Sequence, residues 1–508
     1  MFKKAFILYG CQIYKAVLPL AFTPLILNIL GAERYGMIAF FYMLVALLGL
    51  LDAGVSGSFL KLVATNRSRL IAYKKVAILF CKVFVVFIFI SIVLWLCFYV
   101  GDEYIATNWL NSSIESSEAT YAIKAIGFIL AALYIKSYLS SFLNGMEKQE
   151  WVTIWSVGYS SLFYFISYYA IKNIDNTLIT FFDVMFAVSL LDLFVVICLV
   201  VVVYFKHCRT LNLELLNNKG ADSNLPCSDE LSIKRTLRFS IQLSGLSLIW
   251  VVATQVDKFV LSAYISLDEY AKYQIAVQLC SVIAIFSGPL TQILLPRLSS
   301  LHASNQLQEY SKLYCSSILI FIGVLSPLLP YFFIFGDDLI TLWMKDTMLS
   351  QSINMYAKWL VAAAFIAATM NFVFICLYTL NQLKYHFYAY ATYSLFTIPL
   401  SIFVAKNYGA IGSAQFVFCH TLIFMLVWGG WQMKKKFPSF VGFLVLFYIL
   451  ITVLSSSVFM IMSMILGEST YLAVRVFIPP LCNFLLLCCL FFIFRCKIIS
   501  VISSVKLI

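Results

Sequence analysis

The stretch VAILFCKVFVVFIFISIVLWLCFYV, residues 76–100, contains Lys82 as its single charged residue. A helix rises about 1.5 Å per residue, so a run of this length crosses the roughly 30 Å hydrocarbon core of a bilayer. A β-strand is excluded because the run is long and continuous and does not alternate between apolar and polar residues. The stretch therefore predicts a transmembrane helix.

Similar apolar runs recur from one end of the 508-residue chain to the other. Hydrophobic residues make up 62% of the chain, charged residues make up 11%, and the mean hydropathy is +0.94. A soluble chain of this length would need more charge to cover its surface. We therefore predict an all-α polytopic membrane protein. About fourteen transmembrane helices are expected, at 5–29, 36–60, 76–100, 121–143, 152–171, 178–205, 238–264, 272–295, 313–335, 354–380, 387–405, 411–432, 439–465 and 473–494.

Basic residues indicate how these helices are oriented. With the N-terminus inside the cell, most of the 35 Lys and Arg residues fall on the cytoplasmic side, whereas Asp102, Glu115 and Asp337 fall in external loops. This is the positive-inside pattern, which predicts that both termini are cytoplasmic. It also accounts for the net charge of +12 without a nucleic-acid partner.

The sequence contains no recognisable catalytic or metal-binding motif. It has no GxxxxGK[ST] phosphate-binding loop and no HExxH, its four His are isolated from one another, and its 14 Cys include no CxxC pair. These features predict neither an enzyme nor an ATP-hydrolysing subunit, and we expect no bound cofactor.

A polar segment divides the chain. Residues 206–237 include NNKGADSNLPCSDE and are predicted to form a cytoplasmic linker. The linker separates an N-terminal six-helix lobe at 1–205 from a C-terminal six-helix lobe at 238–432. Two additional transmembrane helices and a cytoplasmic tail follow at 433–508. Because each lobe has an even number of helices, both have the same orientation, as in transporters built from parallel repeats.

Several charged residues lie inside or at the edge of the predicted helices, where a charge costs roughly 2.5–3.5 kcal/mol on insertion scales. They are Lys15, Asp52, Lys82, Lys136, Asp183, Asp192, Asp257, Lys258 and Lys272. Solvation or snorkelling at a helix end explains Lys82, Asp183 and Lys272 equally well. The others are expected to face a cavity or a charged partner.

The lysines of the first lobe indicate the chemistry of a ligand. Lys15, Lys82 and Lys136 all project to the middle or cytoplasmic half of that lobe. A cationic cavity that opens toward the cytoplasm suits an anionic ligand such as a phosphate or diphosphate headgroup. These three lysines are therefore the predicted headgroup-binding residues, with a buried ion pair to Asp52 as the structural alternative for Lys15.

A carboxylate inside a membrane changes its charge when it binds a proton or a sodium ion. Asp52 and Asp257, the latter beside Lys258, are therefore candidates for ion coupling. Structural ion pairs are the alternative for all three residues. With no nucleotide site in the sequence, transport would use an ion gradient, the membrane potential or consumption of the substrate on the far side.

Two segments resemble a known family. ILGAERYGMIAFFYMLVALLGLLDAGVSGSFLKLVA at 29–64 is similar to the opening of bacterial polysaccharide flippases, with Gly31, Tyr35, Gly36, Asp52, Gly54 and Lys61 at the shared positions. The segment at 254–304 is similar to the second-half signature of these flippases, with Asp257, Tyr273, Pro296 and Arg297. Many members have Arg at the position of Lys61, so a specific role for this residue does not carry over.

The chain is thus identified by resemblance as a Wzx-type O-antigen flippase of the multidrug/oligosaccharidyl-lipid/polysaccharide exporter superfamily. The resemblance implies two six-helix lobes around a central cavity, with two extra C-terminal helices. It implies transport of undecaprenyl-diphosphate-linked oligosaccharide, an O-antigen or capsular repeat unit, from the cytoplasmic to the periplasmic leaflet of the bacterial inner membrane. Implied partners are this lipid-linked substrate, the bilayer, and polysaccharide assembly proteins such as a polymerase or a chain-length regulator.

Three other functions are open at this stage. A drug or cation exporter of the same superfamily shares the fold, but such proteins commonly have acidic cavities and twelve spans. A lipid II flippase is nearer in chemistry. A membrane polysaccharide polymerase or ligase is the alternative from a different class, and such enzymes usually carry a sizeable external loop with basic residues, whereas the external loops predicted here are short and acidic.

Overall fold

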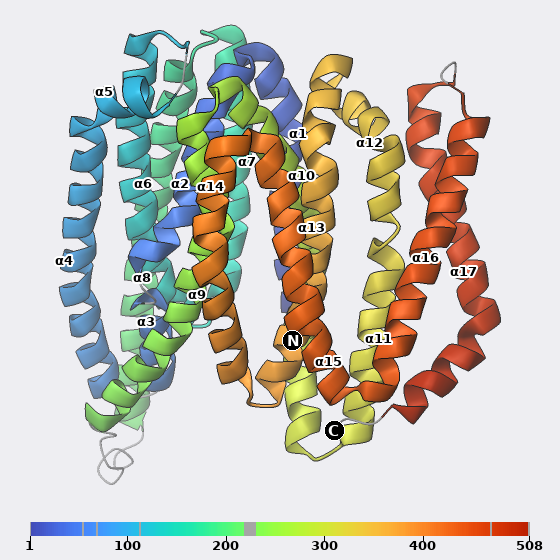
Figure 1. Cartoon of the computed structure of the whole chain (residues 1–508). Coiled ribbons are helices and arrows are strands. Elements are labelled where there is room, and N and C mark those ends of the chain that lie inside the picture. Colours follow the sequence, from blue (N-terminus) through green and yellow to red (C-terminus); the bar gives the residue numbers. More distant parts are fainter. Residues whose placement is uncertain are drawn as a thin grey trace. The chain divides into compact units, whose positions relative to one another are not determined.

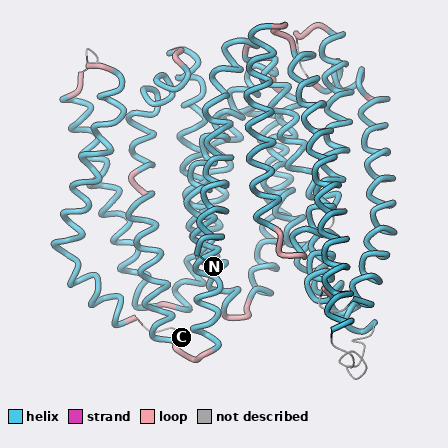
Figure 2. The backbone as a smooth tube through the Cα atoms, turned by 180° about the vertical axis from the view of Figure 1, so that it is seen from behind, coloured by secondary structure: helices cyan, strands magenta, loops and turns pink. Residues whose placement is uncertain are grey.

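The structure is a computed structural model that describes residues 2–52, 55–67, 70–110, 113–217, 230–467 and 470–505. Within these ranges nearly every residue is helical and no β-strand is present, as Figure 2 shows. Ten helical stretches of the described residues are long and apolar enough to cross a membrane. The prediction of an all-α, polytopic membrane protein is confirmed.

The chain divides into two compact units, Met1–Ala271 and Lys272–Ile508. The first unit is built from ten helical elements. They are α1 (Phe2–Leu30), α2 (Ala32–Asp52), α3 (Val55–Asn66), α4 (Leu70–Val100), α5 (Asp102–Tyr104), η1 (Ile105–Trp109), α6 (Ser116–Gly145), α7 (Gln149–Asn173), α8 (Leu178–Asn217) and α9 (Glu230–Tyr264).

The second unit begins within α10 and continues to the C-terminal end of the described chain. Its elements are α10 (Leu267–Ala303), α11 (Leu307–Leu325), α12 (Leu328–Met344), α13 (Thr347–Thr379), α14 (Leu383–Phe424), η2 (Met425–Gly429), α15 (Gly430–Lys436), α16 (Pro438–Ile465) and α17 (Leu472–Ser504).

Each of the fourteen predicted spans falls on one of these helices or on a broken pair. The span predicted at 36–60 is divided between α2 and α3, and the span at 313–335 between α11 and α12. The spans at 387–405 and 411–432 both fall largely in α14 (Figure 1), which reverses direction at Gly409. There φ is 59° and ψ is −152°, a conformation that essentially only glycine adopts.

Helix α6 is the central helix of the first unit, because it packs against α3, α4 and α8 (Figure 1). Its buried Tyr138 stacks between two rings of α4, with centroid distances of 4.4 Å to Phe80 and 4.2 Å to Phe87. The Tyr138 hydroxyl donates to the backbone oxygen of Phe80 at 2.9 Å, so burying the ring leaves no unpaired polar group. These contacts fix the face that α4 turns toward α6.

Two residues of the family-like segment have structural roles in the first part of α2. The buried hydroxyl of Tyr35 lies 3.0 Å from the Thr23 hydroxyl on α1. Gly36 lies so close to Leu267 that a Cβ atom would approach its backbone oxygen to 2.2 Å. A larger residue than glycine would therefore push these backbone segments apart.

In the second unit α13 is the most enclosed helix and packs against α11, α12 and α14. Helices α16 and α17 pack against each other and against α11 and α12. The division of the chain into lobes at 1–205 and 238–432 stays a prediction, and residues 218–229 of the linker lie outside the described residues. The same holds for Gly54 and for the side chain of Lys61.

Candidate functional site

An ion pair joins two helices inside the first unit. The Lys136 ammonium group on α6 donates to Oδ2 of Asp192 on α8. The Asp192 side chain is 1% exposed, whereas that of Lys136 is 19% exposed. The carboxylate is therefore fixed in the interior, and the ammonium group remains reachable from one side.

Two aromatic side chains of α7 complete the surroundings of this pair. The Trp155 indole N–H donates to the other Asp192 oxygen, Oδ1, at 2.8 Å. The Lys136 ammonium lies 4.8 Å from the centroid of the Tyr159 ring, in a cation–π contact. Trp155 and Tyr159 are four residues apart, so they project from the same face of α7.

Lys15 extends from α1 to the same part of α7. Its ammonium group donates to Oγ of Ser156 at 3.1 Å. Ser156 and Tyr159 lie one turn apart, which places Lys15 near Lys136, and the two like charges interact. In the part of the chain that the structure describes, no carboxylate forms an ion pair with Lys15.

We call the set Lys15, Lys136, Trp155, Ser156, Tyr159 and Asp192 the lysine cluster. By formal charge it contains two ammonium groups and one carboxylate, so its formal net charge is positive. An oxyanion such as a phosphate would offset this excess positive charge, because its oxygens accept charge-assisted hydrogen bonds from lysine. The cluster is the candidate functional site.

Lys82 is not part of the lysine cluster. It is exposed on α4, and in the described part of the chain it makes no hydrogen bond or ion pair. Phe80 lies two residues away and is turned toward α6. Two residues correspond to about 200° around a helix, so the packing of Phe80 turns Lys82 toward the opposite side. The structure brings together two of the three predicted headgroup lysines.

The Asp52 carboxylate forms hydrogen bonds with Ser56, four residues later in the chain. Its Oδ1 accepts from the Ser56 backbone N–H at 3.2 Å and from the Ser56 hydroxyl at 2.6 Å. Its observed partner is therefore Ser56, and the ion pair with Lys15 that was considered as an alternative is not formed.

Asp257 and Lys258 are neighbours on α9 and form an ion pair of 3.3 Å. Both side chains are largely buried, at 7% and 14% exposure. The Lys258 ammonium also donates to the backbone oxygen of Thr254 at 2.5 Å. This second polar cluster has no net charge, which makes it a poorer anion site than the lysine cluster.

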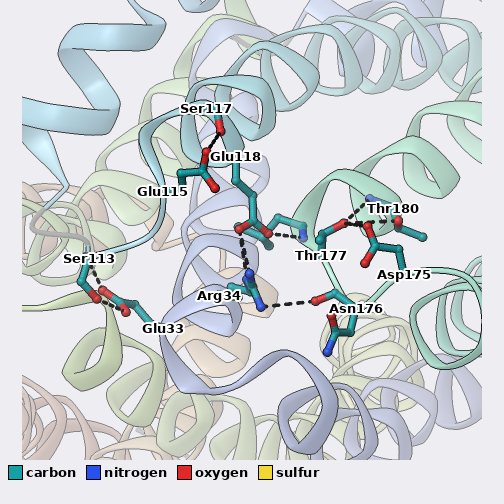
Figure 3. Close-up of polar contacts among 11 residues, drawn as sticks. Glu33, Arg34, Ser113, Glu115, Ser117, Glu118, Asp175, Asn176, Thr177 and Thr180 are labelled. Carbon is teal, nitrogen blue, oxygen red and sulfur yellow. Dashed lines mark hydrogen bonds and ion pairs between the residues drawn. The ribbon is translucent and has the colours of Figure 1, made fainter.

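A separate group of contacts ties helix ends together in the first unit (Figure 3). Arg34 at the start of α2 donates to Glu118 Oε2 from Nε at 3.2 Å and from Nη2 at 2.9 Å. The other Glu118 oxygen accepts from the Leu178 backbone N–H at 2.6 Å, and Arg34 Nη1 donates to the Asn176 backbone oxygen at 3.3 Å. Glu118 thus joins the first turns of α2, α6 and α8.

Replacing Glu118 with alanine is expected to destabilise the first unit. The change leaves the buried Leu178 N–H and the Arg34 guanidinium without their acceptor, at a cost of about 1–3 kcal/mol for each lost bond. Thermal unfolding of the detergent-solubilised protein measures the effect. Glu115→Ala is the matched control, since the exposed Glu115 carboxylate accepts from the Ser117 hydroxyl two residues away. Equal melting temperatures for the two variants would show that Glu118 does not join these helix ends.

Trp155, Ser156 and Tyr159 are the site residues that sequence reasoning missed. They carry no charge inside the predicted span, and aromatic residues are too frequent in this chain to stand out. These residues can be recognised only once α7 is placed beside α6, because Trp155 and Tyr159 then lie on one face opposite the Lys136–Asp192 ion pair. Asp192 was expected to have a partner, and the structure supplies Lys136.

The fold is that of a polytopic membrane protein. Residues 1–302 match the family described as polysaccharide biosynthesis protein, and the chain belongs to this family. A search of curated proteins gave no match.

Solved structures of two kinds share the fold. The lipid II flippase MurJ, in an inward closed conformation, is 14% identical, with a TM-score of 0.73, over 97% of this chain and 100% of that chain. A multidrug resistance MATE family transporter of the MOP superfamily, in an inward-facing conformation, is 11% identical, with a TM-score of 0.59, over 87% and 98%. At these identities the similarity shows the fold alone.

Proposed function

We propose that this protein is a flippase that moves undecaprenyl-diphosphate-linked oligosaccharide from the cytoplasmic to the periplasmic leaflet of the bacterial inner membrane. The oligosaccharide would be an O-antigen or capsular repeat unit. In this proposal the lysine cluster binds the diphosphate headgroup, with Lys15 and Lys136 as its donors. Membership of the polysaccharide biosynthesis family supports the class of substrate.

The observation that carries the proposal is the excess of positive charge in the lysine cluster. Lys15 and Lys136 approach the same face of α7, yet the only carboxylate in the cluster, Asp192, is bonded to Lys136. Holding two ammonium groups together in a partly buried site is unfavourable unless an anion joins them. A diphosphate diester carries its two negative charges on separate phosphates, so it can accept hydrogen bonds from both ammonium groups at once.

Two alternative functions differ from this one in the ligand. A lipid II flippase would use the same diphosphate chemistry, so only the sugar distinguishes it from our proposal. A cation exporter would require a net negative site, and the positive charge of the lysine cluster disfavours it. The fold is shared with a flippase and a MATE family transporter, which favours transport over a polymerase or ligase.

The orientation in the membrane is part of the proposal. The basic residues concentrate in the segments predicted to be cytoplasmic, so we propose that both termini and the 206–237 linker are cytoplasmic. In this orientation the substrate reaches the lysine cluster from the side on which it is assembled. A polymerase and a chain-length regulator would act on the product after it has crossed.

Expression in bacterial strains that lack a single flippase tests the proposed substrate. The gene should restore surface polysaccharide in a strain without its O-antigen or capsular flippase, and should not sustain growth of a strain depleted of its lipid II flippase. Rescue of the second strain alone would identify lipid II as the substrate. Resistance to cationic drugs, without either rescue, would reject the proposal in favour of drug export.

Asp52 and Asp257 are proposed to couple transport to a proton or sodium gradient. Asp52→Asn and Asp257→Asn should each change the dependence of translocation on pH or on sodium in proteoliposomes. Asparagine at 52 still offers a side-chain oxygen to the Ser56 N–H and hydroxyl, so this contact can be kept. Asp183→Asn is the control, because Asp183 is an exposed acceptor for the Tyr121 hydroxyl. Wild-type dependence in both variants would remove these two carboxylates from coupling.

A further inference from the structure

We infer that Asp192 is a built-in counter-ion of Lys136 that the diphosphate of the substrate displaces. This inference rests on the proposed function and assigns a role to a carboxylate that the headgroup site does not itself require. In the substrate-free protein Lys136 is bonded to Asp192, and in the loaded protein the same ammonium group is bonded to a phosphate oxygen.

The first argument is the difference in burial between the two partners. Asp192 is 1% exposed and is bonded from α6 and from α7, by Lys136 and by Trp155. Lys136 is 19% exposed and has a flexible four-carbon stem. An anion that arrives from the exposed side therefore meets the ammonium group first, and the partner that moves is the lysine.

The second argument is that both oxygens of Asp192 have defined partners. The Trp155 indole N–H holds Oδ1 at 2.8 Å whether or not Lys136 is bonded to Oδ2. A buried carboxylate that loses its only partner is strongly destabilised, but Asp192 would keep one hydrogen bond. If Lys136 leaves, the Asp192 carboxylate therefore keeps its hydrogen bond from Trp155.

The third argument concerns the face of Tyr159. The Lys136 ammonium lies 4.8 Å from the centroid of this ring, and the attraction does not depend on which anion the lysine binds. Tyr159 therefore keeps Lys136 near the cluster during the exchange. The neighbouring Lys15 donates to the neutral Ser156 hydroxyl and forms no ion pair with any of the described residues, so it can bind an anion without breaking one.

A counter-ion of this kind sets the strength of binding. The free energy of the Lys136–Asp192 pair must be given up when the diphosphate binds, and it is regained when the diphosphate leaves. A ligand shifts an equilibrium only by the difference between its interactions in the two states. The exchange therefore lowers affinity and favours release, which a transporter needs as much as it needs binding.

Binding of farnesyl diphosphate, a short polyprenyl diphosphate, to the purified full-length protein in lipid nanodiscs tests the inference. Asp192→Asn removes the competing carboxylate and keeps a similar shape. Because one negative charge is removed close to the bound phosphate, we expect affinity to rise at least about tenfold. Asp102→Asn is the matched control. Asp102 of α5 forms an ion pair of 3.0 Å with Lys124, which lies in the first third of α6, the helix that also carries Lys136. It should leave affinity unchanged.

Three outcomes separate this inference from the proposed function. Tighter binding by Asp192→Asn, together with weaker binding by Lys15→Ala, supports both. Weaker binding by Asp192→Asn, together with weaker binding by Lys15→Ala, shows that Asp192 positions Lys136, so the inference is wrong while the headgroup site stands. Unchanged binding by Lys15→Ala and by the Lys136→Gln/Asp192→Asn double variant would reject the headgroup site itself.

Infrared difference spectroscopy of the unmodified protein gives a second test, in case Asp192→Asn fails to fold. Displacement removes an ammonium partner from Asp192, so adding farnesyl diphosphate should shift a carboxylate stretching band. The Lys136→Gln/Asp192→Asn double variant should lack that shift, and its absence would assign the shifted band to the Asp192 carboxylate. A carboxylate region that does not change when the unmodified protein is saturated with farnesyl diphosphate would overturn the inference.

Discussion

Lys15→Ala is expected to reduce export of the lipid-linked oligosaccharide by at least about tenfold while the protein stays at its normal level in the membrane. The substitution removes one charge-assisted hydrogen bond to the diphosphate, which is worth roughly 1.5–3 kcal/mol. Lys15 is bonded to the neutral hydroxyl of Ser156, so its removal leaves no buried carboxylate behind. Surface polysaccharide and membrane abundance, measured in the same cells, check both parts of this expectation.

Two matched variants show whether the charge of Lys15 is responsible. Lys15→Arg keeps the charge and should retain part of the export. Ser156→Ala removes the observed partner of Lys15 and keeps the lysine, so its effect should be small. Normal export by Lys15→Ala would place the headgroup site elsewhere, and loss of the protein from the membrane would identify Lys15 as a structural residue.

Lys136→Ala is expected to behave differently, with a large loss of stability. It leaves Asp192 as a buried charge without its ammonium partner, which costs about 3–5 kcal/mol. The melting temperature of the solubilised protein and its abundance in the membrane should both fall. A defect in export by this single variant would therefore not by itself show that Lys136 binds the substrate.

The Lys136→Gln/Asp192→Asn double variant separates the two roles of Lys136. It replaces both charges with neutral groups that can bond to each other, so stability should return toward that of the unmodified protein. Export should stay low, because the ammonium group is still missing. Recovery of export together with stability would show that Lys136 is needed only to pair with Asp192.

The fold was predictable from the sequence because the bilayer allows few solutions. Long apolar runs such as 76–100 must be helices, since the backbone has no water to bond with in the hydrocarbon. The helix breaks were less predictable. Gly409 lies between the spans predicted at 387–405 and 411–432, but the break between α11 and α12 falls inside the single span predicted at 313–335.

The candidate site was predictable only in part. The sequence indicates that Lys15 and Lys136 need polar partners, because a charge is costly in a membrane, and the structure gives them Ser156 and Asp192. Which charges meet depends on helix rotation and packing. The rings of Phe80 and Phe87 turn one face of α4 toward Tyr138, and that packing leaves Lys82 exposed.

The central claim is that the lysine cluster recognises the diphosphate of a lipid-linked oligosaccharide. Translocation in proteoliposomes tests it most directly when two substrates carry the same sugar and the same polyprenyl chain but differ in having a diphosphate or a monophosphate. We predict that the unmodified protein moves the diphosphate form faster, and that Lys15→Ala loses this preference. Equal rates for the two substrates in the unmodified protein, or the same preference in Lys15→Ala, would contradict the claim.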